Sequence, residues 1–60
     1  MNTMKTIANQ VETFGKYLRT VVTDTGITID IYRMDTVTNA CIYKDKKRSV
    51  RMITFKYAMR

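Results

Sequence analysis

The sequence predicts an α+β fold in which one N-terminal amphipathic helix packs on a three-stranded antiparallel β-meander. Three observations lead to this prediction. Apolar residues recur at helical spacing in the first third of the chain, alternate with polar residues in the middle, and mix with β-branched and aromatic residues near the end. We expect a single small domain over residues 1–60, because a chain of 60 residues is no longer than one typical domain.

A helix is expected over residues 3–22, because seven apolar residues in this segment share one arc at about 100° per residue. They are Met4, Ile7, Val11, Phe14, Leu18, Val21 and Val22. Polar residues occupy the opposite side, namely Lys5, Asn9, Glu12, Lys16 and Arg19. This pattern is typical of a helix that buries a single stripe. Gly15 lies at the edge of the stripe, where the missing side chain lets the helix approach a sheet closely.

Three strands are expected over residues 26–34, 37–44 and 49–57. The first alternates isoleucine with polar or aromatic residues, which is the pattern of a strand with two different faces. The other two are rich in the β-branched and aromatic residues that sheets favour. Turns are expected at residues 35–36 and 45–48, and such short connections join antiparallel neighbours.

The alternation also predicts how the strands pair, because one register gathers the isoleucines on a single face. It pairs Ile31 with Ala40 and Ile29 with Ile42 in the first hairpin, and Ala40 with Ile53 in the second. The helix is then expected to cover Ile27, Ile29, Ile31, Ala40, Ile42, Ile53 and Phe55. The uncovered face, which also carries Met34, is expected to expose an apolar patch of Tyr32, Tyr43, Val50 and Met52. Exposed patches of this kind mark interaction sites.

The net charge lies wholly in the second half of the chain. Residues 1–32 carry three basic and three acidic residues, whereas residues 33–60 carry eight basic and two acidic residues, which gives the formal net charge of +6. The densest segment, residues 44–51, has five cations and one anion. A field concentrated in this way attracts polyanions, so it indicates a type of partner rather than a reaction.

The chain is too short to bury a large core. Only about 60% of the unfolded surface is buried at this size, and small domains compensate with disulfides, metals or self-association. Cys41 is the single cysteine and histidine is absent, so neither an internal disulfide nor a structural zinc site is expected. We therefore expect a homodimer in a reducing, cytoplasmic compartment. No apolar run approaches the ~18 residues of a membrane span, so no membrane partner is expected.

The residue types that usually carry catalysis are missing or scattered. There is no histidine, no glycine-rich phosphate loop and no pair of carboxylates at a useful spacing. Cys41 lies in the middle of an expected strand, with no histidine to activate its thiol. We therefore expect a protein that is not an enzyme, with no catalytic residue, cofactor, metal site or small-molecule substrate.

The main hypothesis is a small basic protein that binds nucleic acid through a cationic β-hairpin on the phosphate backbone. The expected second hairpin carries cations at its turn and on both adjoining strands, namely Lys44, Lys46, Lys47, Arg48 and Arg51. A two-stranded ribbon fits the major groove of DNA, and its basic side chains neutralise phosphates. Tyr43 is a candidate for stacking on unpaired bases, so DNA and RNA both fit. A turn kept soluble by its charges is the simplest alternative.

A second hypothesis is a protein-interaction module. In this case the cationic hairpin meets an acidic protein surface, and the apolar face of Tyr32, Met34, Val50 and Met52 supplies the contact. Small viral or mobile-element accessory proteins work in this way when they bind and inhibit or modulate a larger host complex, such as a nuclease, polymerase or defence system. The same four residues are candidates for the homodimer interface. The small size of the chain favours the dimer but leaves both roles open.

Overall fold

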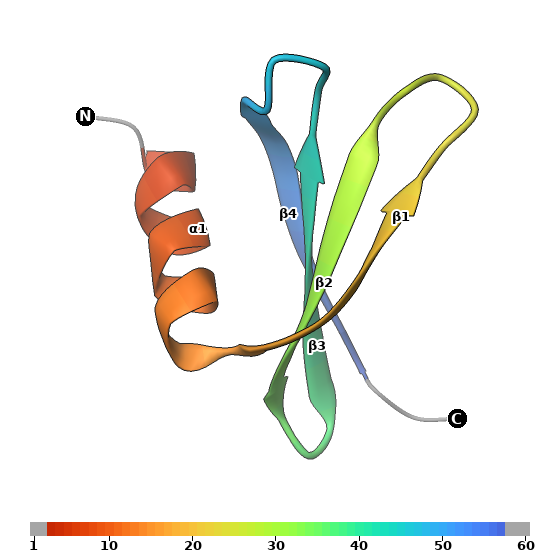
Figure 1. Ribbon diagram of the computed structural model, residues 1–60. Coiled ribbons are helices and arrows are strands. Elements are labelled where there is room, and N and C mark those ends of the chain that lie inside the picture. Colours follow the sequence, from red (N-terminus) through yellow and green to blue (C-terminus); the bar gives the residue numbers. More distant parts are fainter. Residues whose placement is uncertain (1–2, 58–60) are drawn as a thin grey trace.

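One helix and a four-stranded antiparallel sheet make up the computed structural model, which describes residues 3–57 (Figure 1). The elements are α1 (Thr3–Phe14), β1 (Lys16–Val22), β2 (Thr28–Asp35), β3 (Thr38–Lys44) and β4 (Val50–Tyr57). The strands are ordered β1-β2-β3-β4 in the sheet, and each neighbouring pair is antiparallel. The predicted combination of one helix with an antiparallel sheet is confirmed. The predicted number of strands is wrong, because the sheet has four strands rather than three.

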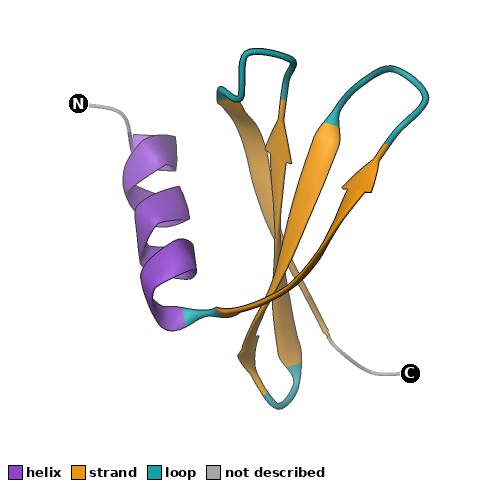
Figure 2. Cartoon of the chain, viewed as in Figure 1, coloured by secondary structure: helices purple, strands orange, loops and turns teal. Residues whose placement is uncertain are grey.

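The extra strand lies in the segment that was expected to extend the helix to residue 22. Helix α1 ends at Phe14, and β1 begins two residues later, after a very short loop (Figure 2). The run Thr20-Val21-Val22 explains the difference, because β-branched side chains lose rotamer freedom in a helix and pack well in a sheet. Pairing with β2 also supplies the backbone hydrogen bonds that a helix would otherwise provide.

Gly15 forms the junction between the helix and the sheet. Its N–H donates a hydrogen bond of 2.7 Å to the carbonyl oxygen of Val11, which closes the last turn of α1. A Cβ atom at this position would lie 2.7 Å from that oxygen and 2.8 Å from Sδ of Met34 on β2. The close approach expected of Gly15 is therefore present, but it occurs at the end of the helix rather than in its interior.

The register between β2 and β3 differs from the prediction by one residue. Ile31 lies opposite Cys41 and Ile29 lies opposite Tyr43. An irregularity between Arg33 and Asp35 offsets the pairing next to the turn, and the sequence pattern contains no indication of it. Because side chains alternate between faces, this shift moves the isoleucines of β2 to the face opposite α1.

The register between β3 and β4 differs by two residues and so keeps the predicted faces. Ala40 lies opposite Phe55, and Ile42 lies opposite Ile53. Side chains two residues apart share a face, so these four residues remain on the side of α1 as expected. The observed strand bounds are within two residues of the predicted ones for β2, β3 and β4.

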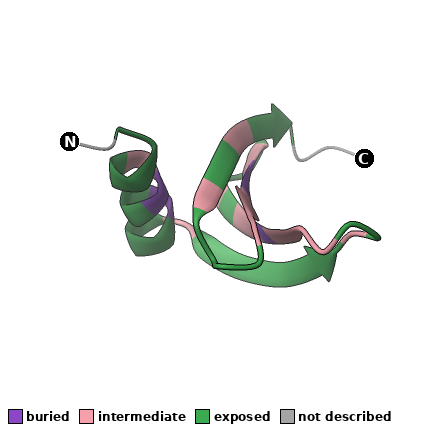
Figure 3. Cartoon of the chain, turned by 90° about the horizontal axis from the view of Figure 1, so that it is seen from above, coloured by how far each residue is buried: buried purple, intermediate pink, exposed green. Residues whose placement is uncertain are grey.

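The core is small and lies where α1 crosses the sheet. Ala8 and Val11 of the helix pack on Ala40 and Ile42 of the central strand β3, and all four are buried. Figure 3 shows the buried part of α1 on the side that faces the sheet. Partly buried apolar residues surround this centre, namely Ile7, Tyr32, Met34, Val50 and Ile53. The predicted core set is therefore wrong for Ile27, Ile29 and Ile31, which are only half-buried, and for Phe55, which is exposed.

Candidate nucleic-acid interface

The loop between β3 and β4 is organised by the carboxylate of Asp45. Its Oδ1 accepts hydrogen bonds of 2.9 Å from the N–H groups of both Lys47 and Ser49. The bond from Ser49 contributes most to holding the pKa of Asp45 below its ordinary value, and the nearby Arg51 guanidinium acts in the same direction. Arg48 has a φ of 67°, in the left-handed region that non-glycine residues rarely adopt. The loop is thus a turn with a defined backbone, from which the cationic side chains project.

The predicted basic cluster divides into paired and unpaired side chains. Nζ of Lys44 lies 3.1 Å from Oδ2 of Asp30 and 3.4 Å from Oε2 of Glu12, and its side chain is only 13% exposed. The guanidinium of Arg51 lies 3.0 Å from the carboxylate of Asp45. The two cations on the strands beside the turn are therefore both paired with carboxylates, and Lys44 is largely buried as well.

Three cations remain at the end of the hairpin. Lys46 and Lys47 are exposed and have no carboxylate partner in the described part of the chain. Arg48 is also exposed, and its Nη2 lies 4.0 Å from Oδ2 of Asp30, at the limit of an ion pair. We call Lys46, Lys47 and Arg48 the hairpin tip. Its side chains are available to an anionic partner.

Asp30 is the centre of a polar network beneath this hairpin. Its side chain accepts a hydrogen bond of 2.8 Å from Oγ1 of Thr20, whose hydroxyl lies 2.7 Å from that of Tyr17. Burial raises the pKa of Asp30, but the hydrogen bonds from Thr20 and Lys44 and the charges of Lys44 and Arg48 outweigh it, so the pKa lies below its ordinary value. The network links α1, β1, β2 and β3 through satisfied partners, which is the arrangement of a structural group rather than a reactive one.

The pKa of Lys44 is shifted in the opposite direction, above its ordinary value. Burial by itself lowers the pKa of Lys44, whereas its hydrogen bonds and charge interactions with Asp30 and Glu12 raise the pKa overall. Burial and the same two carboxylates raise the pKa of Tyr32, which lies beside this network. At neutral pH the lysine and the aspartate are therefore both charged, and the tyrosine is neutral.

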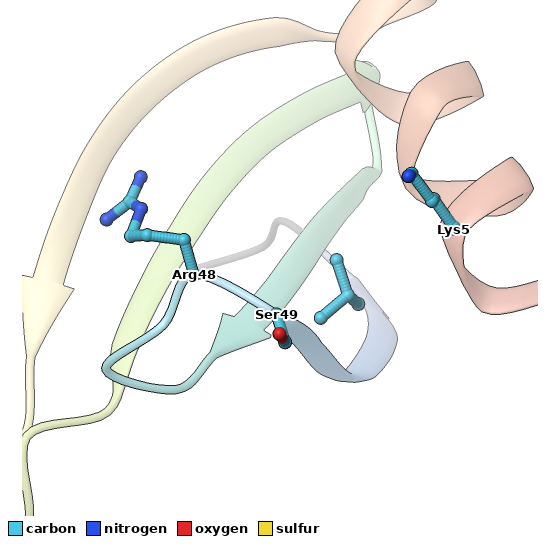
Figure 4. A pocket seen from close by; sticks show the side chains of 4 residues that line it. Lys5, Arg48 and Ser49 are labelled. Atoms are coloured by element: carbon cyan, nitrogen blue, oxygen red, sulfur yellow. The ribbon is translucent and has the colours of Figure 1, made fainter.

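A pocket of about 300 Å³ lies between the hairpin tip and the first turns of α1, and Lys5, Arg48, Ser49 and Val50 line it. Figure 4 shows Lys5 projecting from the helix on one side, while the Arg48 side chain extends from the hairpin over the strands on the other. The two cationic groups do not point toward a common centre. The pocket therefore adds positive charge near the hairpin tip without forming a closed anion site.

No described element covers the side of the sheet opposite α1, which we call the open face. Direct cross-strand partners place Lys16, Arg33, Asn39 and Lys56 in one row on this face. The next row contains Arg19, Ile31, Cys41 and Thr54, and the row after it contains Val21, Ile29, Tyr43 and Met52. We call Lys16, Arg19, Arg33 and Lys56 the basic row set. All four are exposed, and no described carboxylate lies on these three rows.

The sequence did not predict the basic row set, for two reasons. Its pattern puts Lys16 and Arg19 on the polar side of a helix, although they belong to β1. The pairing of Arg33 with Lys16 and Asn39 could not be seen without the added strand and its register. The β-branched run at residues 20–23 was the one feature of the sequence that favoured a strand here.

The four residues predicted to form one partner face lie on two sides of the sheet. Tyr32, Met34 and Val50 pack against the core beneath α1, whereas Met52 is half-exposed on the open face. Tyr43 is also on the open face and so points away from Lys44, its neighbour in the chain. The structure thus brings Tyr43 and Met52 together, but separates them from the other predicted apolar contacts.

Between residues 3 and 57, no three histidine, cysteine or carboxylate side chains come close enough together to hold a metal ion. The helix in that range is too short and too polar to cross a bilayer. Neither family models, nor curated protein sequences, nor solved structures include a match to this chain.

Proposed function

We propose that this protein binds nucleic acid, with the hairpin tip on the phosphate backbone. The observation that supports this most is the presence of exposed lysines without partners at Lys46 and Lys47, in a loop whose backbone is fixed by Asp45. Preorganised cations displace the counterions of a polyanion at little conformational cost. The net charge of +6 adds long-range attraction toward the same partner.

Fluorescence anisotropy with labelled single-stranded and double-stranded oligonucleotides tests this function. Binding is expected to weaken steeply between low salt and about 0.2 M salt, because each phosphate contact releases counterions. The double variant Lys46→Glu/Lys47→Glu is expected to lose at least about tenfold in affinity, since it replaces two attractions by repulsions. The charge-preserving control Lys46→Arg/Lys47→Arg should bind as the unmodified protein does. Equal affinity of the two double variants would exclude the hairpin tip as a contact.

We propose a binding role rather than catalysis, without a cofactor or small-molecule substrate, in a reducing, cytoplasmic setting. Supporting this, the ionised Asp30 is held by satisfied structural partners, and the free thiol of Cys41 is buried in β3. A buried thiol without a base is an inert packing group. A hydrolysis or transfer activity that is present in the purified unmodified protein and lost in the Asp30→Asn variant would overturn this proposal.

Self-association also belongs to the proposed function. Only five apolar residues are buried among those the structure describes, whereas ten large apolar residues are exposed there. Phe55 and Tyr57 are 53% and 78% exposed on the edge strand β4, beside a pocket of about 490 Å³ that Thr38 and Lys56 help to line. We propose that a second copy covers this edge to form a homodimer, because a small core gains most from added burial.

The same edge supports the second candidate, a small accessory protein that inhibits or modulates a larger complex. An unpaired edge strand can accept a strand of another protein, and the apolar side chains of Phe55 and Tyr57 would fix the alignment. The variant Phe55→Asp distinguishes this candidate from nucleic-acid binding. It is expected to release a bound protein while leaving oligonucleotide affinity unchanged, and the opposite pattern would count against an accessory role.

A further inference from the structure

We infer that the open face of the sheet is a second nucleic-acid contact, separate from the hairpin tip, and that it takes single strands in preference to duplexes. This inference rests on the proposed function, because it assumes that the chain binds nucleic acid. Apart from Tyr43, it concerns residues that the hairpin hypothesis does not use. Two features of the face carry it, a set of cations without carboxylates and an apolar field beside them.

Three of the cations lie in one row across the sheet, with Asn39 between the second and the third. Lys16 pairs with Arg33 across β1 and β2, and Lys56 lies on β4 opposite Asn39 of β3. Neighbouring strands are about 4.8 Å apart, so the row from β1 to β4 spans roughly 14 Å. Arg19 extends the charge toward the next row. Since none of these side chains has a carboxylate partner within residues 3–57, their charge is directed outward.

Apolar side chains lie in the two rows next to Lys16, Arg33 and Lys56. The first of these rows contains Ile31 and Cys41 between Arg19 and Thr54, and the second contains Ile29, Tyr43 and Met52. Unpaired bases offer flat apolar surfaces, and stacking on an aromatic ring such as Tyr43 is independent of sequence. A duplex presents its phosphates but keeps its bases stacked inside. A single strand is therefore the polyanion that matches the cations and the apolar field together.

Two polar side-chain atoms on this face also lack partners. Oδ1 of Asn39 and Oγ1 of Thr54 are buried without a hydrogen bond from any described residue. Asn39 lies between Arg33 and Lys56, and Thr54 lies in the adjoining row opposite Cys41. Base edges carry both donors and acceptors, so a bound base could satisfy such atoms once the overlying side chains move.

The open face and the hairpin tip are far enough apart to be tested separately. The row of Lys16, Arg33, Asn39 and Lys56 lies where β1 and β3 begin and where β2 and β4 end. The tip connects the end of β3 with the beginning of β4, at the other end of the sheet (Figure 1). One double substitution can therefore be placed in each region without touching the other.

The test compares Arg33→Glu/Lys56→Glu with Lys46→Glu/Lys47→Glu, two variants that lower the net charge by the same amount. Anisotropy is measured with an oligothymidine of about 16 nucleotides and with a duplex of equal length, over a range of salt concentrations. The open-face variant is expected to lose at least about tenfold in affinity for the single strand. Its salt dependence should also become shallower by about 1.4 in log–log slope, since two phosphate contacts are removed.

Each outcome separates the inference from the proposed function. If only the hairpin variant loses affinity, the inference is overturned and the proposed function stands. If only the open-face variant loses affinity, the inference stands and the hairpin tip is excluded. Tighter binding of the duplex than of the single strand overturns the single-strand preference, and no binding by the unmodified protein overturns both proposals.

A second measurement guards against variants that fail to fold. Circular dichroism identifies such a failure, and the milder pair Arg33→Gln/Lys56→Gln then replaces the charge reversal. Amide chemical shifts of the unmodified protein are also followed by NMR during titration with the oligothymidine. Shifts that cluster at residues 31, 33, 41 and 54 support the inference, whereas shifts confined to the hairpin tip overturn it.

Discussion

At the scale of single residues, Asp30 shows how a charge can be stabilised in so small a molecule. It is 5% exposed, and it is held by Lys44 at 3.1 Å and by the hydroxyl of Thr20 at 2.8 Å. An ion pair of this kind adds little net stability when both partners are present, but the loss of one partner leaves the other buried and uncompensated. Asp30 and Lys44 therefore depend on each other.

The substitution Asp30→Asn is expected to lower the free energy of unfolding by about 2 kcal/mol, because Lys44 loses its nearest carboxylate and keeps only Glu12 at 3.4 Å. Urea denaturation measures this change. Asp24→Asn is the matched control, since it removes the same charge from an exposed position in the loop after β1. Similar unfolding free energies for the two variants would show that the buried pair does not stabilise the fold.

The pKa of Asp30 predicts a pH dependence with a defined sign. Because the pKa is lower in the folded state than in the unfolded chain, the stabilisation is fully present above the unfolded pKa of about 4 and is lost as the pH falls through the lower folded-state pKa. The difference in unfolding free energy between the unmodified protein and Asp30→Asn should therefore shrink on acidification. Denaturation curves at several pH values check this, and a difference that grows toward low pH would contradict the assigned direction.

The backbone of Arg48 is strained, and this strain is separate from the contact that its side chain makes. A φ of 67° costs a non-glycine residue about 1 kcal/mol, whereas glycine adopts it freely. Arg48→Gly is therefore expected to be more stable than Arg48→Ala by about 1 kcal/mol, although both variants lose the contact with Asp30. Thermal unfolding of the pair isolates the backbone effect. Equal midpoints would show that the loop relaxes without cost.

At the scale of elements, local patterns identified the strands that alternate and the first half of the helix. Strands β2, β3 and β4 were located because residues 26–57 combine β-branched residues with clear turns. Strand β1 was missed because its apolar residues also fit helical spacing, so the β-branched run was outweighed. The register of β2 could not be predicted, since burying Asp30 is favourable only when Lys44 and Thr20 are placed beside it.

The helix–strand junction makes a prediction that opposes helix propensity. Replacing glycine by alanine within a helix usually stabilises it by up to about 1 kcal/mol. Gly15→Ala is instead expected to destabilise the protein by about 1–3 kcal/mol, because the new Cβ would lie 2.7 Å from the carbonyl oxygen of Val11. Asn9→Ala, at an exposed position of α1, is the control that gains propensity without a clash. Stabilisation by both substitutions would contradict the close packing.

At the scale of the whole molecule, the exposed positive charge does not lie only in the second half of the chain, where the sequence has its excess of cations. The excess lies in residues 33–60, yet Lys44 and Arg51 are paired internally, while Lys16 and Arg19 from the first half join Arg33 on the open face. The composition predicts a polyanionic partner, and this stays a prediction. Which cations are exposed to solvent depends on ion pairs and strand order, which link positions far apart in the chain.

The exposed edge at β4 gives the last prediction, which concerns self-association. If a second copy covers Phe55 and Tyr57, folding and dimerisation are coupled, and the midpoint of thermal unfolding rises with protein concentration. A tenfold increase in concentration is expected to raise the midpoint by about 3–6 °C for a chain of this size. The variant Phe55→Ser should abolish this dependence, whereas Val22→Ser, at an exposed position of β1 on the opposite edge of the sheet, should preserve it. A midpoint that is independent of concentration in the unmodified protein, together with a monomeric mass in light scattering, would rule out the dimer. The exposed edge would then remain available to a different protein.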